Sequence, residues 1–302
     1  MDRIQQMQVF IQIVESGNFT RAAEVLGLPR STISTTVQTL EDRIGTRLFQ
    51  RTTRQVKPTQ DGLRFLETAR ELVETMERAE NLFRQEPEDI RGPLRIDLPI
   101  RLARLNVIPS LPDFFRRYPN ITLDLSATDR LIDLMAEGVD GVVRLAELEN
   151  SDLICRRLGD MATITVASTG YVAEHGMPQT PDDLTEHWLV NYAQHMPAPV
   201  AEWDYMDGDR AASISMNSRI CVDNSEAYFA AALSGLGLIQ VPEHSVQRDI
   251  AEGRLVEVLP GYRAAPVQLS FIYHSRRNQS LRLRVFIDWL QELLKKQNLL
   301  LN

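Results

Sequence analysis

The chain has 302 residues, with 33 lysines and arginines, 41 aspartates and glutamates, a formal net charge of −8 and 43% hydrophobic residues. These values suit a globular protein of two or three domains and exclude a disordered or collagen-like chain. The sequence shows no signal peptide and no long apolar run, so it predicts a cytoplasmic protein without a membrane partner.

The charge is unevenly distributed along the chain. Residues 1–62 carry 8 Lys and Arg against 6 Asp and Glu, whereas residues 63–302 carry 25 against 35. The acidity therefore lies outside the first sixty residues, which are mildly basic. The two cysteines, Cys155 and Cys221, are far apart in the sequence and are interpreted as reduced structural thiols, with a redox-sensing pair as the alternative.

Three short helices are predicted at the N-terminus. The first, over residues 4–15, has apolar residues with the i, i+3, i+4, i+7 spacing of one helix face, at Met7, Phe10, Ile11 and Val14. Thr20 is the predicted cap of the second helix, which ends at Gly27. The third runs from about residue 31 to Arg43, and Gly45 closes it.

The third helix has a polar face opposite its apolar stripe, and a basic strand and turn follow it at residues 51–54. Three helices followed by a basic hairpin are the layout of a winged helix-turn-helix, which presents a helix to the DNA major groove. We therefore predict that the third helix contacts DNA through Arg30, Ser31, Thr32, Ser34, Thr35 and Gln38. From the turn, Arg51 and Arg54 are predicted to contact phosphates.

About sixty residues resemble the DNA-binding domain of LysR-type transcriptional regulators, including the segments Ala22-Ala23, Leu48-Phe49-Gln50-Arg51 and Thr59-Gln60-Asp61-Gly62. Two positions depart from the family pattern. Pro29 stands where the family often has Ser, so that no side chain is available to cap the third helix. Thr35 stands where the family often has Arg or Lys, and Arg30 is a candidate replacement for the lost contact.

The resemblance implies a regulator that binds double-stranded promoter DNA and responds to a small-molecule effector. It implies a homodimer and, from two dimers, a homotetramer, with RNA polymerase as a further candidate partner. The implied architecture is α/β with a helical head: a winged helix-turn-helix (1–58), a linker helix (59–90) and a two-lobed, periplasmic-binding-protein-like effector domain (91–302). Lobe I would hold residues 91–162 and 268–302, and lobe II residues 163–267.

A long helix is predicted over residues 59–86, with Thr59 as its cap. Its apolar residues alternate at spacings of three and four, at Leu66, Ala69, Val73, Met76 and Phe83. So narrow a seam suits a partner helix, and the resemblance favours a dimer contact that includes Val73 and Met76. The alternative is an amphipathic helix that packs on its own chain. Residues 87–93 then form a short hinge.

From Leu94 onward, predicted strands and helices alternate, with strands at 94–98, 121–126, 141–145 and 152–157. The helix at 102–117 is expected to be interrupted near Pro109 and Pro112, and another is expected at 130–137. This alternation predicts a mainly parallel, doubly wound sheet. A second such unit occupies about 169–261, and the strand 267–273 with the helix 279–297 completes the first. The chain would cross twice between two lobes, near 161–168 and 262–268, which leaves a cleft between them.

Ligands bind such folds where strands end and helices begin. The candidate effector-binding residues in these loops are Ile100, Arg101, Thr128, Asp129, Arg144, Tyr192 and Asn224. Helix N-termini at 128–129 and 223–224, with Arg101 at the mouth of the cleft, favour a small carboxylate. Asp129 and Asp223 favour hydroxyl or amine groups instead. Alternatively, Thr128 and Asn224 are only helix caps and Arg101 is a solvated surface residue.

An enzyme and a solute-binding protein are the competing classes. Gly235-Leu236-Gly237 lacks the third glycine of a dinucleotide site, and neither a phosphate loop nor an HExxH motif is present. Five histidines and two cysteines show no metal-ligand spacing, so neither a metal nor a cofactor is predicted. A solute-binding protein would fit the C-terminal two-thirds, but the N-terminal head and the missing export signal argue against it.

Overall fold

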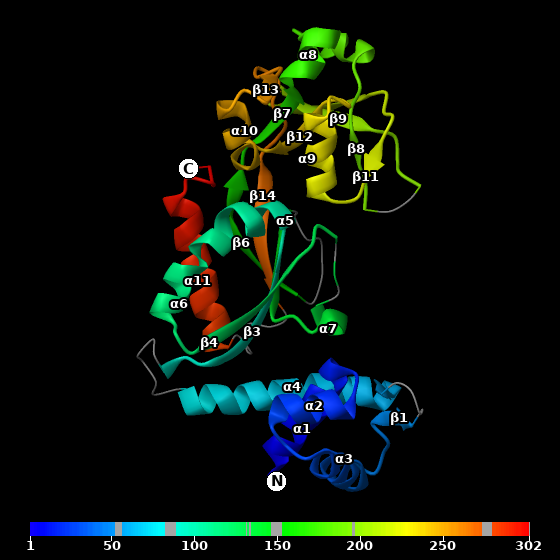
Figure 1. Ribbon diagram of the computed structural model, residues 1–302, viewed down its shortest axis with the longest axis vertical. Coiled ribbons are helices and arrows are strands. Elements are labelled where there is room, and N and C mark those ends of the chain that lie inside the picture. Colours follow the sequence, from blue (N-terminus) through cyan, green and yellow to red (C-terminus); the bar gives the residue numbers. More distant parts are fainter. Residues whose placement is uncertain are drawn as a thin grey trace. The chain divides into compact units, whose positions relative to one another are not determined.

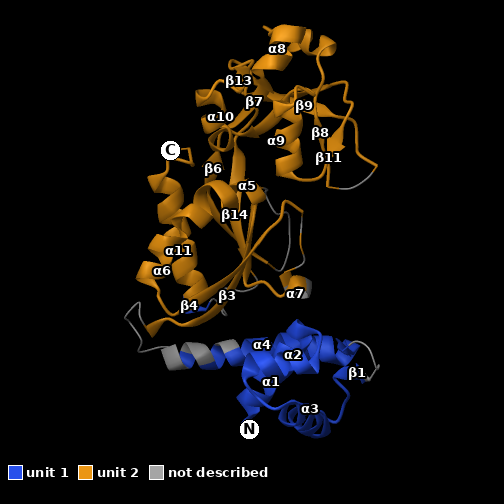
Figure 2. Ribbon diagram, in the orientation of Figure 1, with its two compact units in different colours: residues 1–86, 277–281 blue, residues 87–276, 282–302 orange. Residues whose placement is uncertain are grey.

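The computed structural model describes residues 1–51, 56–81, 89–130, 132, 134–145, 153–194, 197–273 and 280–301. The chain divides into two compact units, residues 1–86 with 277–281 and residues 87–276 with 282–302 (Figure 2). None of the helices in the described part of the chain has an apolar run of membrane-spanning length.

The first unit consists of three helices, a two-stranded hairpin and one long helix. In chain order these are α1 (Arg3–Ser16), α2 (Phe19–Leu26), α3 (Arg30–Ile44), β1 (Phe49–Arg51), β2 (Val56–Pro58) and α4 (Gln60–Asn81) (Figure 1). Strands β1 and β2 pair in antiparallel fashion. Phe10 is fully buried, and its ring centroid lies 5.1 Å from that of Phe49 and 5.2 Å from that of Phe65. The aromatic rings thus hold α1, the hairpin and α4 around one core.

The caps of these helices agree with those predicted from the sequence, except for the cap of α2. Asn18, rather than Thr20, caps α2, because its side chain accepts a hydrogen bond from the Thr20 N–H at 2.7 Å. Pro29 precedes α3 and gives no side-chain cap, as predicted. At α4 the Thr59 hydroxyl accepts from the Gly62 N–H at 2.9 Å, which confirms the predicted cap.

Gly62 is explained by a close approach between α4 and the chain before β1. A Cβ atom at this position would lie 2.1 Å from the Leu48 carbonyl oxygen, a distance that no side chain tolerates. The glycine of the Thr59–Gly62 motif therefore lets the long helix start directly against the segment that leads into the hairpin.

The second unit begins with a five-stranded sheet, which we call the first lobe together with its helices. Its strand order is β4-β3-β5-β14-β6. The strands are β3 (Gly92–Leu98), β4 (Ile121–Ala127), β5 (Gly141–Leu145), β6 (Ile154–Met161) and β14 (Val267–Tyr273). The sheet is mixed rather than mainly parallel, because β3 runs parallel to β4 and β5 whereas β14 runs antiparallel to β5 and β6. Strand β14 arrives from the other lobe without the crossover helix that parallel pairing needs.

The helices of the first lobe are α5 (Ile100–Leu102), a π-helical segment (Ala103–Val107), α6 (Ile108–Arg117), α7 (Leu134–Glu137) and α11 (Leu281–Lys296). The predicted interruption near the prolines was wrong. Pro109 lies in the first turn of α6, and Pro112 lies within the same helix. The π-helical segment, whose turns are wider than those of an α-helix, lies directly before these prolines. Among the described residues α7 begins only at Leu134, four residues later than expected. Helices α6 and α11 lie side by side, with Phe114 and Trp289 rings 5.1 Å apart (Figure 1).

The second lobe is built around the antiparallel sheet β12-β7-β13. Its strands are β7 (Thr163–Ser168), β8 (Asn191–Tyr192), β9 (Glu202–Asp207), β10 (Arg210–Ser215), β11 (Cys221–Val222), β12 (Ile239–Pro242) and β13 (Leu255–Val258). Its helices are α8 (Thr169–His175), α9 (Ser225–Leu233) and α10 (Gln247–Ala251), with 3-10 turns at Pro181–Glu186 and Glu243–Ser245. The antiparallel hairpin of β9 and β10 was not predicted.

The chain passes from the first lobe to the second between β6 and β7 and returns between β13 and β14. The turn before β12 also requires glycine, because a Cβ on Gly237 would lie 2.5 Å from the Trp188 carbonyl oxygen. The glycine therefore lets the turn after α9 pass close to the backbone of the segment that leads to β8.

Candidate functional site

Helix α3 presents a continuous polar face to solvent. Its buried residues are Ile33, Thr36, Val37, Leu40 and Glu41. On the other side, Thr32 is half-buried and the remaining predicted DNA contacts are exposed, namely Arg30, Ser31, Ser34, Thr35 and Gln38. The structure thus brings together all six residues that the sequence singled out on this helix. Short polar side chains on an exposed helix can approach base edges without steric conflict.

The hydroxyl of Thr35 already donates a hydrogen bond to the Ser31 carbonyl at 2.9 Å. In this rotamer its oxygen can still accept a hydrogen bond, and a base amino group in the major groove is a suitable donor. A phosphate, which only accepts, would require the hydroxyl to rotate. The geometry therefore favours a contact from Thr35 to a base.

The hairpin is attached to α3 by a buried carboxylate that the sequence did not reveal. Glu41 is 6% exposed and accepts hydrogen bonds from the N–H groups of Leu48 at 2.8 Å and Phe49 at 3.3 Å. It also pairs with Arg47 at 2.9 Å. Of the predicted hairpin contacts, Arg51 ends β1, but its side chain lies outside the described residues, as does all of Arg54.

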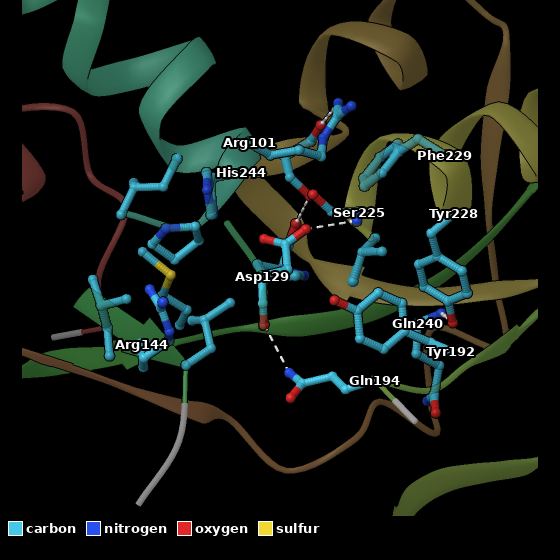
Figure 3. Close-up of a pocket in the computed structure, with 18 residues that line it drawn as sticks. Arg101, Asp129, Arg144, Tyr192, Gln194, Ser225, Tyr228, Phe229, Gln240 and His244 are labelled. Atoms are coloured by element: carbon cyan, nitrogen blue, oxygen red, sulfur yellow. Dashed lines mark hydrogen bonds between the residues drawn. The ribbon is translucent and has the colours of Figure 1, made fainter. Parts of the chain in front are cut away.

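A cavity of about 350 Å³ lies between the two lobes of the second unit (Figure 3). Its walls are mostly apolar. They include the rings of Tyr192, Tyr228 and Phe229 and the aliphatic side chains of Leu102, Leu145, Met161, Val241 and Leu269. The size and lining are those of a site for a small organic molecule, at the lower end of the range of about 300–1,000 Å³ usual for such pockets.

Four of the seven predicted effector residues line this cavity, namely Arg101, Asp129, Arg144 and Tyr192. The other three, Ile100, Thr128 and Asn224, do not. Asn224 caps α9, since its side chain accepts from the Ala227 N–H at 3.0 Å. Thr128 donates to the buried Asp97 at 3.1 Å, and Ile100 offers its backbone N–H to Asp129.

Arg101 is neither a free cation at the mouth of the cleft nor a solvated surface residue. It is 8% exposed, and its guanidinium carbon lies 3.3 Å from the centroid of the Phe229 ring. Its Nη2 donates to the Ser245 carbonyl at 2.7 Å and its Nη1 to Glu226 at 3.3 Å. Burial lowers the pKa of Arg101, and the Glu226 carboxylate opposes that change. The side chain ties the first lobe to the second.

Arg144 is also committed to protein partners. It is 5% exposed and forms an ion pair of 2.5 Å with Asp97. It also donates to the Val143 carbonyl at 2.7 Å, the Arg130 carbonyl at 2.9 Å and the Thr128 hydroxyl at 3.2 Å. The terminal nitrogens of Arg101 and Arg144 therefore bond other parts of the protein. The Nε atom of each is buried and has no partner among the described residues.

The carboxylate of Asp129 lies where the sequence predicted an anionic ligand. One oxygen accepts from the Ile100 N–H at 3.0 Å. The other accepts from the Ser225 N–H at 2.6 Å, and Figure 3 shows this second bond. Ile100 begins α5 in the first lobe, and Ser225 begins α9 in the second. The loop at Thr128–Asp129 is thus not a helix N-terminus, contrary to the prediction; it supplies an anion to two other helices.

Two uncharged polar groups at the cavity have no partner in the described part of the chain. They are the hydroxyl of Ser225 and the Nδ1 atom of His244. Burial, followed by the nearby charge of Arg101, lowers the pKa of His244 to about 4, so the imidazole is neutral at neutral pH. Burial also raises the pKa of Tyr228 to about 12. Neither Ser225 nor His244 was among the effector-binding residues predicted from the sequence, although Ser225 follows the end of a predicted strand.

Within the described ranges, no group of three or more His, Cys, Asp or Glu side chains could hold a metal ion. Cys155 is exposed, Cys221 is half-buried, and both are free thiols. The chemistry of the cavity is that of recognition, with apolar walls, a few hydrogen-bonding groups and charges that already have partners.

Comparison with known proteins gives two family matches. The model described as LysR substrate binding domain matches residues 87–295, and that for bacterial regulatory helix-turn-helix protein, lysR family, matches residues 4–63. The chain is 38% identical to the uncharacterized HTH-type transcriptional regulator YhjC of Escherichia coli, over 98% of this chain and 99% of that one. The structure of CrgA, a LysR-type transcriptional regulator from Neisseria meningitidis, is similar with a TM-score of 0.61 and 31% identity, and the match covers 97% and 98% of the two chains.

Proposed function

The chain belongs to the LysR family of bacterial transcriptional regulators, and from this premise we propose how its parts divide the work. Residues 1–58 bind promoter DNA, 59–90 pair two copies of the chain, and 91–302 bind the effector between lobe I (91–162 and 268–302) and lobe II (163–267). As a regulator that acts on DNA, the protein works in the cytoplasm.

The exposed polar face of α3 is the observation that supports DNA binding by this unit. In our proposal Arg30, Ser31, Thr32, Ser34, Thr35 and Gln38 enter the major groove, while Arg51 and Arg54 contact phosphates from the hairpin. Base contacts by Thr35 and Gln38 set sequence preference, and the arginines of the hairpin add affinity for any sequence.

The test compares Arg51→Ala with Gln38→Ala in DNA-binding titrations at several salt concentrations. Loss of one phosphate contact should lower the salt slope of log K by about 1 and weaken binding to all sequences alike. Gln38→Ala should instead change the preferred sequence, by about 1–3 kcal/mol if its contact to a base is bidentate. Arg3→Ala, an exposed arginine on α1, is the matched control and should leave the slope unchanged. An unchanged slope for Arg51→Ala would refute the hairpin contact.

The cavity between the lobes supports effector binding. A bound molecule that fits one arrangement of the lobes better than another shifts their populations, and in our proposal this shift changes how the heads engage DNA. A screen of small metabolites by thermal unfolding of the full chain tests the site. A ligand present at about 100 times its Kd should add about 2.7 kcal/mol of stability.

Ser225→Leu fills part of the cavity and should abolish the stabilisation of any molecule that binds there. Ser234→Leu makes the same exchange at the exposed far end of α9 and should leave the stabilisation intact. A ligand that stabilises both variants equally binds elsewhere, and the proposed site is then wrong.

Pairing of two copies through α4 rests on its exposed apolar side chains. Leu66 and Ala69 belong to the core of the head, and Val73 is only 9% exposed in the single chain. This part of the predicted seam is therefore covered by the chain itself. Leu72 and Met76 are 43% and 45% exposed and are our proposed dimer contact; Phe83 lies outside the described residues. Two such dimers would form a tetramer, and RNA polymerase remains a candidate partner.

A further inference from the structure

The carboxylate of Asp129 links the two lobes at the point where a bound anion would lie. It accepts hydrogen bonds from the first backbone N–H of α5 and the first of α9, at 3.0 and 2.6 Å. Its own backbone carbonyl accepts from the Gln194 side chain at 2.7 Å. The protein therefore supplies its own anion to both helix starts, and a carboxylate ligand would find these donors occupied.

The other cationic groups at the cavity already pair with protein carboxylates, and their buried Nε atoms are the nitrogens left without a partner among the described residues. The terminal nitrogens of Arg101 bond Ser245 and Glu226, and those of Arg144 bond Asp97 and neighbouring carbonyls. A carboxylate entering the cavity would lose its hydration and lie near the charge of Asp129, and the guanidinium groups of Arg101 and Arg144 there already have carboxylate partners. Burial of such a charge without a partner is strongly unfavourable.

Apart from the Nε atoms of the two arginines, the buried polar atoms at the cavity that lack a partner among the described residues are neutral. The Ser225 hydroxyl and the His244 Nδ1 atom are buried without partners in the described part of the chain, and both line the cavity. Three aromatic rings, those of Tyr192, Tyr228 and Phe229, form much of the remaining wall. An aromatic molecule with a hydroxyl or carbonyl group would satisfy both the rings and the polar atoms.

We propose that the effector is an uncharged aromatic molecule bearing a hydroxyl or carbonyl group that bonds Ser225 and His244, and that Asp129 excludes carboxylates. This inference rests on the proposed effector site between the lobes. It assigns Asp129 a role in specificity, because its side chain holds the positions that a ligand carboxylate would take.

The test uses three probes with the same ring system: 2-naphthylmethanol, 2-naphthoate and 2-naphthylmethylamine. Their affinities for the full chain are measured by calorimetry with wild type, Asp129→Ala and Asp223→Ala. Asp223 is the matched control because it is exposed two residues before Ser225 and bonds the Asn224 side chain, so its removal takes away a nearby negative charge without freeing either N–H group. Asp129→Asn is a second variant in case alanine disturbs the fold.

Wild type should bind the alcohol about tenfold or more tightly than the acid. Asp129→Ala should tighten binding of the naphthoate by about tenfold or more, since two backbone donors become free, whereas Asp223→Ala should change it little. Ser225→Ala and His244→Phe should each weaken binding of the alcohol.

The proposal would be overturned if wild type binds the acid or the amine most tightly. It would also be overturned if the two Asp→Ala variants gain equal affinity for the naphthoate. Binding of no probe to any form would remove the effector site itself, and with it the proposal.

Discussion

At the scale of single residues, Glu41 decides how the hairpin is held to the DNA-binding head. Its buried carboxylate serves the N–H groups of Leu48 and Phe49. We expect Glu41→Ala to lower the free energy of unfolding by about 1–3 kcal/mol, because it leaves buried donors without an acceptor. Urea denaturation and amide hydrogen exchange over residues 46–51 would measure the loss. Glu41→Gln retains one acceptor oxygen and should cost less; equal effects of the two variants would contradict this account.

A second prediction at this scale concerns pH. The pKa of His244 is lowered to about 4 in the folded chain, against about 6.5 when unfolded, so the unfolded state binds more protons between these values. Stability from neutral His244 is present above pH 6.5 and is lost as the pH falls toward 4. Between pH 7 and 5 this should cost about 2 kcal/mol.

The measurement is the urea midpoint of wild type and His244→Gln at both pH values. The variant should lose less stability than wild type on acidification. Burial also lowers the pKa of His187, so part of the acid sensitivity should remain in both proteins. Identical pH dependence in the two proteins would show that His244 is protonated without cost.

The sequence located the region of the cavity but not the state of its side chains. The rule that ligands lie at strand ends identified the loops of Asp129 and Tyr192 because that rule depends only on topology. The Arg101 guanidinium is buried because it bonds Ser245, which is 144 residues further along the chain, and packs on the Phe229 ring. Contacts of this kind come from tertiary packing, which local spacing does not encode.

At the scale of elements, α4 carries the next prediction. Leu72→Glu with Met76→Glu should abolish the proposed dimer, because it places charges in an apolar contact at a cost of several kcal/mol. Sedimentation of the full chain would show the change in mass. Leu63→Glu is the control, since Leu63 is 52% exposed and lies on the opposite side of the same helix. A dimer that survives the double change would place the contact elsewhere.

The helices of the head followed closely from the sequence, whereas the sheet directions did not. Apolar spacing reports roughly which face of a helix is buried, and α3 buries its apolar stripe around Ile33. For α1 the prediction was partly wrong: Phe10 is buried, but the buried face runs through Gln6, Val9 and Ile13, whereas Met7, Ile11 and Val14 are only half-buried. A strand pattern says nothing about direction, so the sheet was predicted to be mainly parallel, whereas β14 runs antiparallel to both of its neighbours. The β9–β10 hairpin was overlooked, although its two-residue turn, Gly208-Asp209, lies between runs in which apolar residues alternate, at Trp203 and Tyr205 and at Ala212 and Ile214.

At the scale of the whole molecule, the charge distribution bears on how the protein binds DNA. With only 8 basic residues against 6 acidic ones in residues 1–62, a single head has little electrostatic attraction for phosphates. Two heads joined by α4 would double the number of phosphate contacts and make the second contact intramolecular. Specific binding should therefore depend on pairing more strongly than it would for a strongly basic domain.

This argument gives a last prediction. The affinity of the full chain is measured against salt for DNA with one half-site and with two half-sites in phase. Because the slope of log K scales with the number of phosphates contacted, it should be about twice as steep for the two-site DNA. The Leu72→Glu, Met76→Glu variant should give the same shallow slope on both DNAs. Equal slopes for the wild type would mean that each head binds alone, and the proposed role of α4 in DNA binding would then fail even if dimers form in solution.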